Sequence, residues 1–277
     1  MRSQIPDGFL QSLTTNGFSD LGLTPIRESE LFRPIALSRL HLENKLELRR
    51  RQQASALGEA EFKGKEKVYA YDLGSIENQQ ALISFIQRKQ PSLVEGLQVA
   101  NNNELLWQTS LRVCDDLCLL RETTKGYRLI AGSLCAPSAW SLASMLGKSV
   151  AQLHAPVPSL NHERASSIDR LLSHLSITKS FQRFNWALKT TDCLALFPGT
   201  KPFMPKSFDD IYLRIERQTL TRISRFSVVF GIDVTVGKLT NVCAQEPSLR
   251  KLLINAYRKL SDQQLKYKGI VDFGKFL

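Results

Sequence analysis

The arrangement of the β-prone runs constrains the fold of this chain more than any other feature of its sequence. Two short apolar runs, Leu117–Leu120 and Tyr127–Ile130, flank the polar segment Glu122–Gly126, a pattern typical of a β-hairpin. Three further β-prone runs follow at Phe181–Lys189, Ile211–Thr219 and Phe226–Thr235. Strand and helix do not alternate regularly between them, so we expect an α+β fold with a mostly antiparallel sheet and helices packed on it.

Helical periodicity dominates the N-terminal third and the stretches between the strands. Apolar residues three and four apart predict a helix over Ser75–Gln90, which Pro91 ends. The leucine-rich stretch Glu28–Ala54 is also helical in pattern, with a proline near its start. Further helices are expected from the N-cap Ser138 along an apolar stripe to Leu153, over Glu163–Leu175, and over about 246–265.

Length and composition predict one folded domain over residues 1–277. The apolar content of 43% and the charged content of 23% are ordinary for a globular protein. We expect a helical part at about 1–110, a sheet core at about 111–240 and a C-terminal helix at about 246–265. No apolar run approaches the roughly 20 residues that cross a bilayer, and the N-terminus lacks a signal peptide's apolar stretch. A cytoplasmic protein without membrane attachment is therefore expected.

The five cysteines and the net charge narrow the functional classes further. An odd, scattered set of cysteines predicts reduced thiols rather than a disulfide framework or a metal cluster. The formal charge of +11 gathers at Arg49–Arg51 and at Lys63, Lys65 and Lys67. This basic cluster is a docking face for an acidic protein, a nonspecific nucleic-acid surface or simply a solvated face. Nucleic acid is the less favoured partner, because no nucleic-acid-binding motif or interleaved aromatic residue accompanies the charges.

The four histidines include one candidate for chemistry. His41 and His174 lie in amphipathic helical patterns, where surface or boundary positions are expected. His154 stands where a helix must end, directly before a turn with two prolines. A side chain at such a rigid position suits a metal ligand or an acid–base group, with a structural histidine as the alternative. His162 is the fourth.

The predicted strand around Arg214–Gln218 carries charges in its middle. Period-two alternation puts Arg214, Glu216 and Gln218 on one face and Arg217 on the other. An arginine beside apolar neighbours usually requires an anion, such as a ligand carboxylate, and a solvated strand face is the alternative. The chain has no glycine-rich nucleotide loop, GxSxG motif or HExxH motif, so any redox chemistry needs a cofactor bound without those loops.

Several motifs occur in an order that resembles one protein family. The segment 129–140 (LIAGSLCAPSAW) carries an Ala-Gly step, a Cys and Pro-Ser-x-Trp, and the segment 213–220 reads LRIERQTL. Further matches are the segments 21–25 (LGLTP), 146–148 (LGK), 154–158 (HAPVP), 183–186 (RFNW) and 267–269 (YKG). In these motifs the chain resembles the haem-binding alpha subunit of haem-dependent oxidative N-demethylases.

The resemblance implies a fold, a cofactor and a reaction. The fold would be a PAS-like antiparallel sheet wrapped by helices, and the cofactor b-type haem. The reaction would be O₂-dependent oxidation of a small secondary amine, such as dimethylamine, to a primary amine and formaldehyde. Electrons would come from a separate reductase with flavin and iron–sulfur centres, because this chain has neither a dinucleotide loop nor an iron–sulfur cysteine set.

The resemblance also suggests site residues. His154 is the expected axial ligand of the haem iron, with His162 in reserve, and Arg217 is the expected propionate partner. The motif residues Trp140 and Asn185 are expected to contact the cofactor, and Glu216 is an expected catalytic group.

Two departures from the family pattern bear on activity. Asp233 stands where the family has an arginine, which would invert the local field at a catalytic position, and a smaller residue, Ala136, replaces an aromatic one. Asp233 therefore leaves an alternative open: a haem- or ligand-binding PAS-like sensor or accessory protein without turnover.

Overall fold

The β-prone runs form one antiparallel sheet in the computed structural model. Within the residues that the structure describes, the sheet has seven strands in the spatial order β1-β5-β6-β7-β3-β4-β2. The described residues are 5–15, 22–56, 67–99, 101–158, 162–200, 204–270 and 273–276, without the side chains of 162–165. The strand bounds are Thr24–Ile26 (β1), Tyr69–Tyr71 (β2), Asp116–Thr123 (β3), Gly126–Ser133 (β4), Ser180–Lys189 (β5), Tyr212–Ser224 (β6) and Ser227–Lys238 (β7). The predicted α+β class and the β3–β4 hairpin are confirmed.

The helices surround this sheet. Their bounds are Phe9–Thr15 (α1), Arg39–Ala56 (α2), Ile76–Lys89 (α3), Leu105–Ser110 (α4), Leu142–Met145 (α5), Val150–His154 (α6), His162–His174 (α7), Leu239–Gln245 (α8), Ser248–Arg258 (α9) and Asp262–Lys268 (α10). The predicted helices at α3 and α7 are confirmed to within a residue or two. None of the described helices is long and apolar enough to cross a lipid bilayer.

Two of the predicted helices are interrupted in the structure. The stretch expected to run from Ser138 to Leu153 begins as a helix only at α5, and Gly147 separates α5 from α6 with a φ of +79°. Glycine adopts this left-handed conformation at little cost, and the helix ends there. The apolar residues keep their helical spacing on both sides of Gly147, so the sequence pattern did not reveal the break. The single helix expected over 246–265 is replaced by parts of α9 and α10, with Ser261 capping α10 through a hydrogen bond from the Gln264 backbone.

The first long helix, α2, begins later than predicted and buries an unexpected face. Between Glu28 and Leu37 the chain forms two short 3-10 turns, so the helix starts only at Arg39. His41 and Lys45 are buried, while Leu40 and Leu46 are 59% and 48% exposed. The prediction of a surface or boundary position for His41 was wrong, because its ring is buried against the sheet, where Nε2 lies 2.9 Å from the Val234 carbonyl oxygen. The Nζ atom of Lys45 donates to three backbone carbonyls, which satisfies its three N–H groups.

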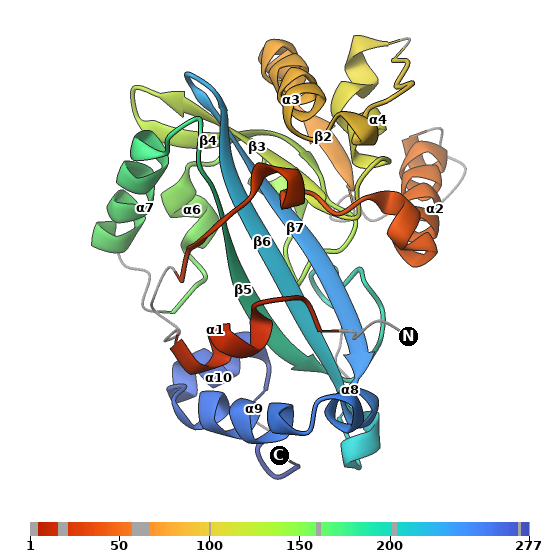
Figure 1. Cartoon of the computed structure of the whole chain (residues 1–277), viewed down its shortest axis with the longest axis vertical. Coiled ribbons are helices and arrows are strands. Elements are labelled where there is room, and N and C mark those ends of the chain that lie inside the picture. The colour runs from red at the N-terminus through yellow and green to blue at the C-terminus, as the bar shows by residue number, and fades with distance from the viewer. Residues whose placement is uncertain are drawn as a thin grey trace.

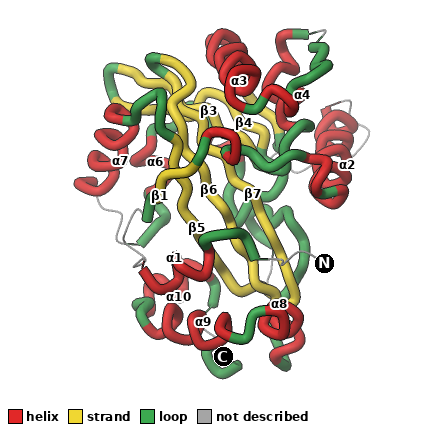
Figure 2. Tube along the Cα trace, viewed as in Figure 1, coloured by secondary structure: helices red, strands yellow, loops and turns green. Residues whose placement is uncertain are grey.

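The sheet separates two apolar layers. Helices α2, α3 and α4 cover one face, and α6 and α7 lie on the other, with α1, α9 and α10 gathered at one end (Figures 1 and 2). Successive residues of one strand enter different layers: Leu117 packs with the α3 side and Cys118 with the α7 side. Val229 and Val228 divide in the same way. This alternation decides which charged residues can meet one another.

Asp233 lies in the layer of α2, not with the α6–α7 layer. Nε and Nη2 of Arg33 donate to its two carboxylate oxygens at 2.5 and 2.6 Å. The Nε2 atom of His41 lies 3.7 Å from Oδ1 of Asp233. Where the family has an arginine, this chain has Asp233, and the positive charge beside it comes from Arg33 instead. The ion pair largely neutralises the charge of Asp233, so the expected inversion of the local field is small.

Arg217 lies opposite Asp233 in the β6–β7 register and points to the same side. Its guanidinium donates to the carbonyl oxygens of Glu30 and Leu31 and to Oε1 of Gln182. The alternation predicted for the strand is confirmed. The hydrogen bonds of Arg217 with described residues all go to neutral oxygen atoms rather than to a carboxylate.

The predicted basic docking face loses one of its members. Arg49 donates to Glu104 at 2.6 Å with only 13% of its side chain exposed. Its guanidinium also lies over the rings of Tyr69 and Trp107, 4.9 and 5.4 Å from their centroids. Arg49 is thus a packing residue. Arg50, Arg51 and Lys67 are exposed, and Lys63 and Lys65 lie outside the described residues, so docking through these residues stays a prediction.

Removal of Arg33 tests the ion pair with Asp233. Arg33→Met leaves the Asp233 charge buried without its partner, so we expect the free energy of unfolding to fall by roughly 3 kcal/mol. The double change Arg33→Met with Asp233→Met removes both charges and should recover most of that loss. Urea denaturation of the three proteins measures both effects. If the double variant were no more stable than Arg33→Met, the loss of stability would not come from the unpaired charge of Asp233, and this account of the ion pair would be wrong.

Candidate functional site

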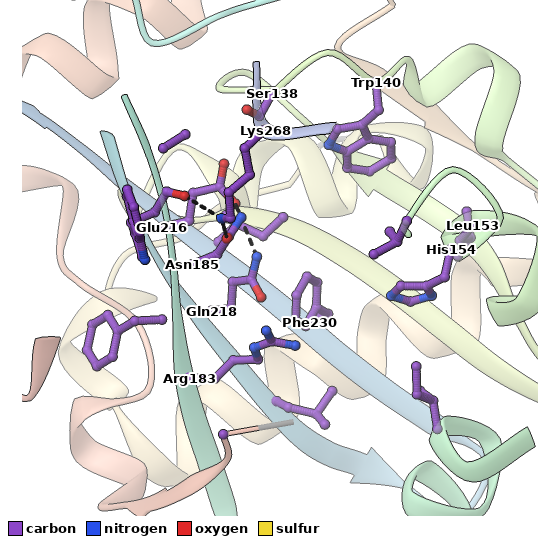
Figure 3. A pocket seen from close by; sticks show the side chains of 18 of the residues that line it. Ser138, Trp140, Leu153, His154, Arg183, Asn185, Glu216, Gln218, Phe230 and Lys268 are labelled. Carbon is purple, nitrogen blue, oxygen red and sulfur yellow. Dashed lines mark hydrogen bonds between the residues drawn. The ribbon is translucent and has the colours of Figure 1, made fainter. Parts of the chain in front are cut away.

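A cavity of about 670 Å³ lies on the α6–α7 side of the sheet. Its walls come from strands β3 to β7, from α1, α6 and α7, and from α9 and α10 near the C-terminus. The volume falls within the range of about 300–1,000 Å³ for small-molecule and cofactor sites. Figure 3 shows the side chains of some of the residues that line it.

The strands supply a polar wall. Arg183 and Asn185 alternate along β5, and Glu216 and Gln218 alternate along β6, so all four point to the cavity. The register pairs Asn185 with Glu216 and Arg183 with Gln218. Because directly opposed residues share a face, pairing of the two strands brings these groups together.

Glu216 is the centre of the hydrogen bonds in this wall. Its Oε2 atom accepts from Nδ2 of Asn185 and from Nε2 of Gln218, both at 3.1 Å, and its Oε1 atom accepts from Nε of Arg214 at 3.3 Å. Burial raises the pKa of Glu216, but the Arg214 charge and these hydrogen bonds outweigh burial and hold the pKa below its ordinary value. Glu216 is therefore a carboxylate at neutral pH.

Lys268 brings the C-terminal helix α10 into the site. Its Nζ atom donates to Oδ1 of Asn185 at 2.9 Å and to the Trp186 carbonyl at 2.6 Å. Burial, opposed by the charge of Glu216, lowers the pKa of Lys268 to about 8. Asn185 thus links a lysine to a carboxylate, with its amide oxygen facing Nζ and its amide nitrogen facing Glu216 (Figure 3).

His154 reaches the cavity from the end of α6 (Figure 3). Its Nδ1 atom lies 2.9 Å from the Val150 carbonyl oxygen. A carbonyl only accepts, so Nδ1 carries the proton and Nε2 keeps its lone pair. Burial lowers the pKa of His154, which favours the neutral imidazole that ligates metals.

Arg183 lines the cavity without a hydrogen bond to any residue in the part of the chain that the structure describes, and its Nε atom is buried. Burial lowers the pKa of Arg183, which remains a cation because the ordinary value for arginine is so high.

The rest of the wall is apolar or aromatic. Both Trp140 and Phe230 line the cavity. In Figure 3, Trp140 lies near His154, and Phe230 lies near Gln218 and Arg183. Aliphatic side chains complete the lining, among them Leu120, Leu129, Leu153, Leu171, Leu220 and Ile232. An apolar enclosure with a few polar groups at fixed positions is the usual form of a cofactor or ligand pocket.

The structure brings four of the predicted site residues together: Trp140, His154, Asn185 and Glu216. Ala136, the small residue at the second departure, also lines the cavity. Arg217 and Asp233 do not reach it, because they point to the opposite face of the sheet. The side chain of His162 lies outside the described residues.

Three contributors were missed. Gln218 could have been assigned to the site because it lies two residues after Glu216 in a strand and therefore shares its face. Arg183 could have been assigned in the same way, because it lies two residues before Asn185 in a predicted strand. Lys268 could not be placed from local pattern, because its position depends on how α10 docks against β5.

A comparison with known protein families gives a match. Residues 75–277 match the family described as haem-dependent oxidative N-demethylase, alpha subunit-like. No curated protein sequence matches the chain significantly. The family match covers well over half of the chain, including every strand that lines the cavity. The chain therefore belongs to the haem-dependent oxidative N-demethylase alpha-subunit-like family.

Proposed function

We propose that this chain is a single-domain, haem-binding oxidoreductase subunit, and that His154 is the axial ligand of the haem iron. The observation that carries the proposal is the orientation of His154. Its Nδ1–H is fixed by the Val150 carbonyl and its Nε2 lone pair is available for a metal. In metal sites generally, a hydrogen bond from the ring nitrogen that does not bind the metal orients the histidine ligand in this way. The family description, which names haem, supports the same assignment.

The cavity fits a large apolar cofactor with charged edges. Its walls are mostly aliphatic and aromatic, and its cations come from strand β5 (Arg183 and Lys189) and from the C-terminal segment (Lys259 and Lys268). The other histidines whose side chains are described lie elsewhere: His41 is buried against the opposite face and His174 is exposed at the end of α7. The sequence has no Cys-x-x-Cys-His motif for covalent attachment, so the proposed cofactor is b-type haem.

The proposed reaction is oxidative N-demethylation of a small secondary amine. Bound haem supplies the oxidising chemistry with O₂, and the overall change consumes amine, O₂, two electrons and two protons to give a primary amine, formaldehyde and water. Glu216, held as a carboxylate by Arg214, offers an acceptor for an amine N–H. Asn185 and Lys268 hold that carboxylate and its neighbours in place.

The electrons would come from a separate protein. The chain has no glycine-rich dinucleotide loop, and the family description calls its members alpha-subunit-like, which supports a partner subunit. We propose a flavin- and iron–sulfur-containing reductase in this role.

A non-catalytic sensor or accessory protein is the alternative interpretation. Its main support was Asp233 at a catalytic position. Because Asp233 is paired with Arg33 on the far face of the sheet, that argument loses much of its weight.

The absorption spectrum tests the ligand assignment. We expect purified protein mixed with haem to give a Soret band that His154→Ala shifts or abolishes, because the iron loses its nitrogen ligand. Added imidazole should restore much of the original spectrum by replacing the missing side chain. The matched control, His174→Ala, removes an exposed imidazole and should leave the band unchanged. An unaltered band in His154→Ala would contradict the assignment.

Formaldehyde release tests the reaction. With dimethylamine, O₂ and a surrogate reductant, the haem-loaded protein should release formaldehyde. Glu216→Gln keeps the size of the side chain but removes its charge, so kcat/KM should fall by at least about tenfold, the equivalent of one charge-assisted hydrogen bond. Glu47→Gln, a change at a half-exposed position on α2, is the control. Haem-loaded protein that releases no formaldehyde from dimethylamine would favour the sensor interpretation.

A further inference from the structure

Arg183 differs from the other arginines that point from the central strands. Arg214 donates to the carbonyl oxygens of Leu194 and Ala136, and Arg222 donates to those of Leu172, Ser173, Leu175 and Arg225. Arg217 is also satisfied by backbone and amide oxygens. No hydrogen bond joins Arg183 to any described residue, although its Nε atom is fully buried.

Among the residues that the structure describes, no carboxylate forms a hydrogen bond or an ion pair with Arg183. The nearest acidic influence is Glu216, whose charge raises the pKa of Arg183 but does not outweigh burial. The oxygens of Glu216 already accept from Asn185, Gln218 and Arg214. The cross-strand neighbour Gln218 directs its amide nitrogen to Glu216, away from Arg183. Burying the Nε atom without a hydrogen bond is costly, because a polar atom removed from water normally gains a partner.

The cavity around Arg183 has an excess of positive charge. Lys189 and Lys268 also line it, and burial lowers the pKa of each. Glu216 is the one carboxylate among the described lining residues. Figure 3 shows the guanidinium of Arg183 extending from β5 into the cavity, with His154 on the facing wall. This field favours a ligand that carries negative charge, and a planar guanidinium binds a carboxylate with two parallel hydrogen bonds.

We propose that Arg183 is a carboxylate-binding site within the cavity. The proposal rests on the proposed function for the identity of the ligand, and two sources have the required chemistry. One is a propionate of haem. The other is a carboxylate on the amine substrate, which would make the substrate an N-methyl amino acid rather than a simple dialkylamine.

The porphyrin arm uses a probe that needs no axial ligand. Iron-free protoporphyrin IX and its dimethyl ester differ in the charge of the propionates, and fluorescence titration gives the Kd of each. If the propionate is the ligand, the native protein binds the free acid more tightly than the ester. Arg183→Gln then weakens the free acid by roughly 10- to 100-fold, leaves the ester nearly unchanged, and so removes the discrimination. Arg183→Lys keeps a cation and should recover part of it. Arg51→Gln, which removes one exposed charge, is the control for net charge.

The substrate arm uses N-methylglycine and dimethylamine with the same variants. A carboxylated amine that binds the native protein raises its melting temperature, and the rise disappears in Arg183→Gln but not in Arg51→Gln. Either result, loss of the acid–ester discrimination or loss of the N-methylglycine response, supports the site and identifies its source. Native and Arg183→Gln proteins that respond equally in both arms overturn it. A separate measurement tests the haem proposal: it fails if the absorption spectrum shows no Soret band that depends on His154.

Discussion

The pairing of β5, β6 and β7 is the constraint on which the rest of the site depends. Alternation along these strands sends Glu216 to the cavity and Arg217 to the opposite layer, one residue apart. A slip of one residue in the pairing would exchange the two faces, placing Arg217 and Asp233 in the cavity and Glu216 in the layer of α2. The closed ion pair of Asp233 with Arg33 and the carbonyl contacts of Arg217 therefore stabilise the same register that assembles the site.

The electrostatics of the two faces are opposite in character. On the α2 face, the charges of Asp233 and Lys45 are satisfied within the protein by Arg33 and by backbone carbonyls. On the cavity face, Arg183 forms no hydrogen bond with any described residue, and His154 presents a nitrogen lone pair. Other buried atoms, such as Oδ1 of Asp115 and Nε of Arg49, also lack a hydrogen-bond partner among the described residues, but Arg183 and His154 line the cavity, where a ligand can reach them. A metal-centred cofactor with carboxylate substituents would satisfy both groups at once.

The sequence was sufficient for the five central strands, β3 to β7, and for Trp140, His154, Asn185 and Glu216 in the site, but not for the three-residue edge strands β1 and β2. Strands with strong β-prone runs, such as β6 and β7, are set by local pattern, and His154 was found because prolines fix the end of its helix. Asp233 and Arg49 could not be placed in this way, because their partners, Arg33 and Glu104, come from distant segments. The break at Gly147 could not be predicted for a different reason. The apolar residues keep a helical spacing across Gly147, although its positive φ interrupts the helix. Lys268 enters the site only through docking of α10, a tertiary contact without a local signal.

The central claim is that the cavity holds haem through His154. A crystal structure of the protein loaded with haem tests it most directly. The account predicts haem within the cavity, its iron bonded to Nε2 of His154 while Nδ1 keeps its hydrogen bond to the Val150 carbonyl. Haem bound outside the cavity, or ligated by another residue while His154 keeps its present surroundings, would contradict it.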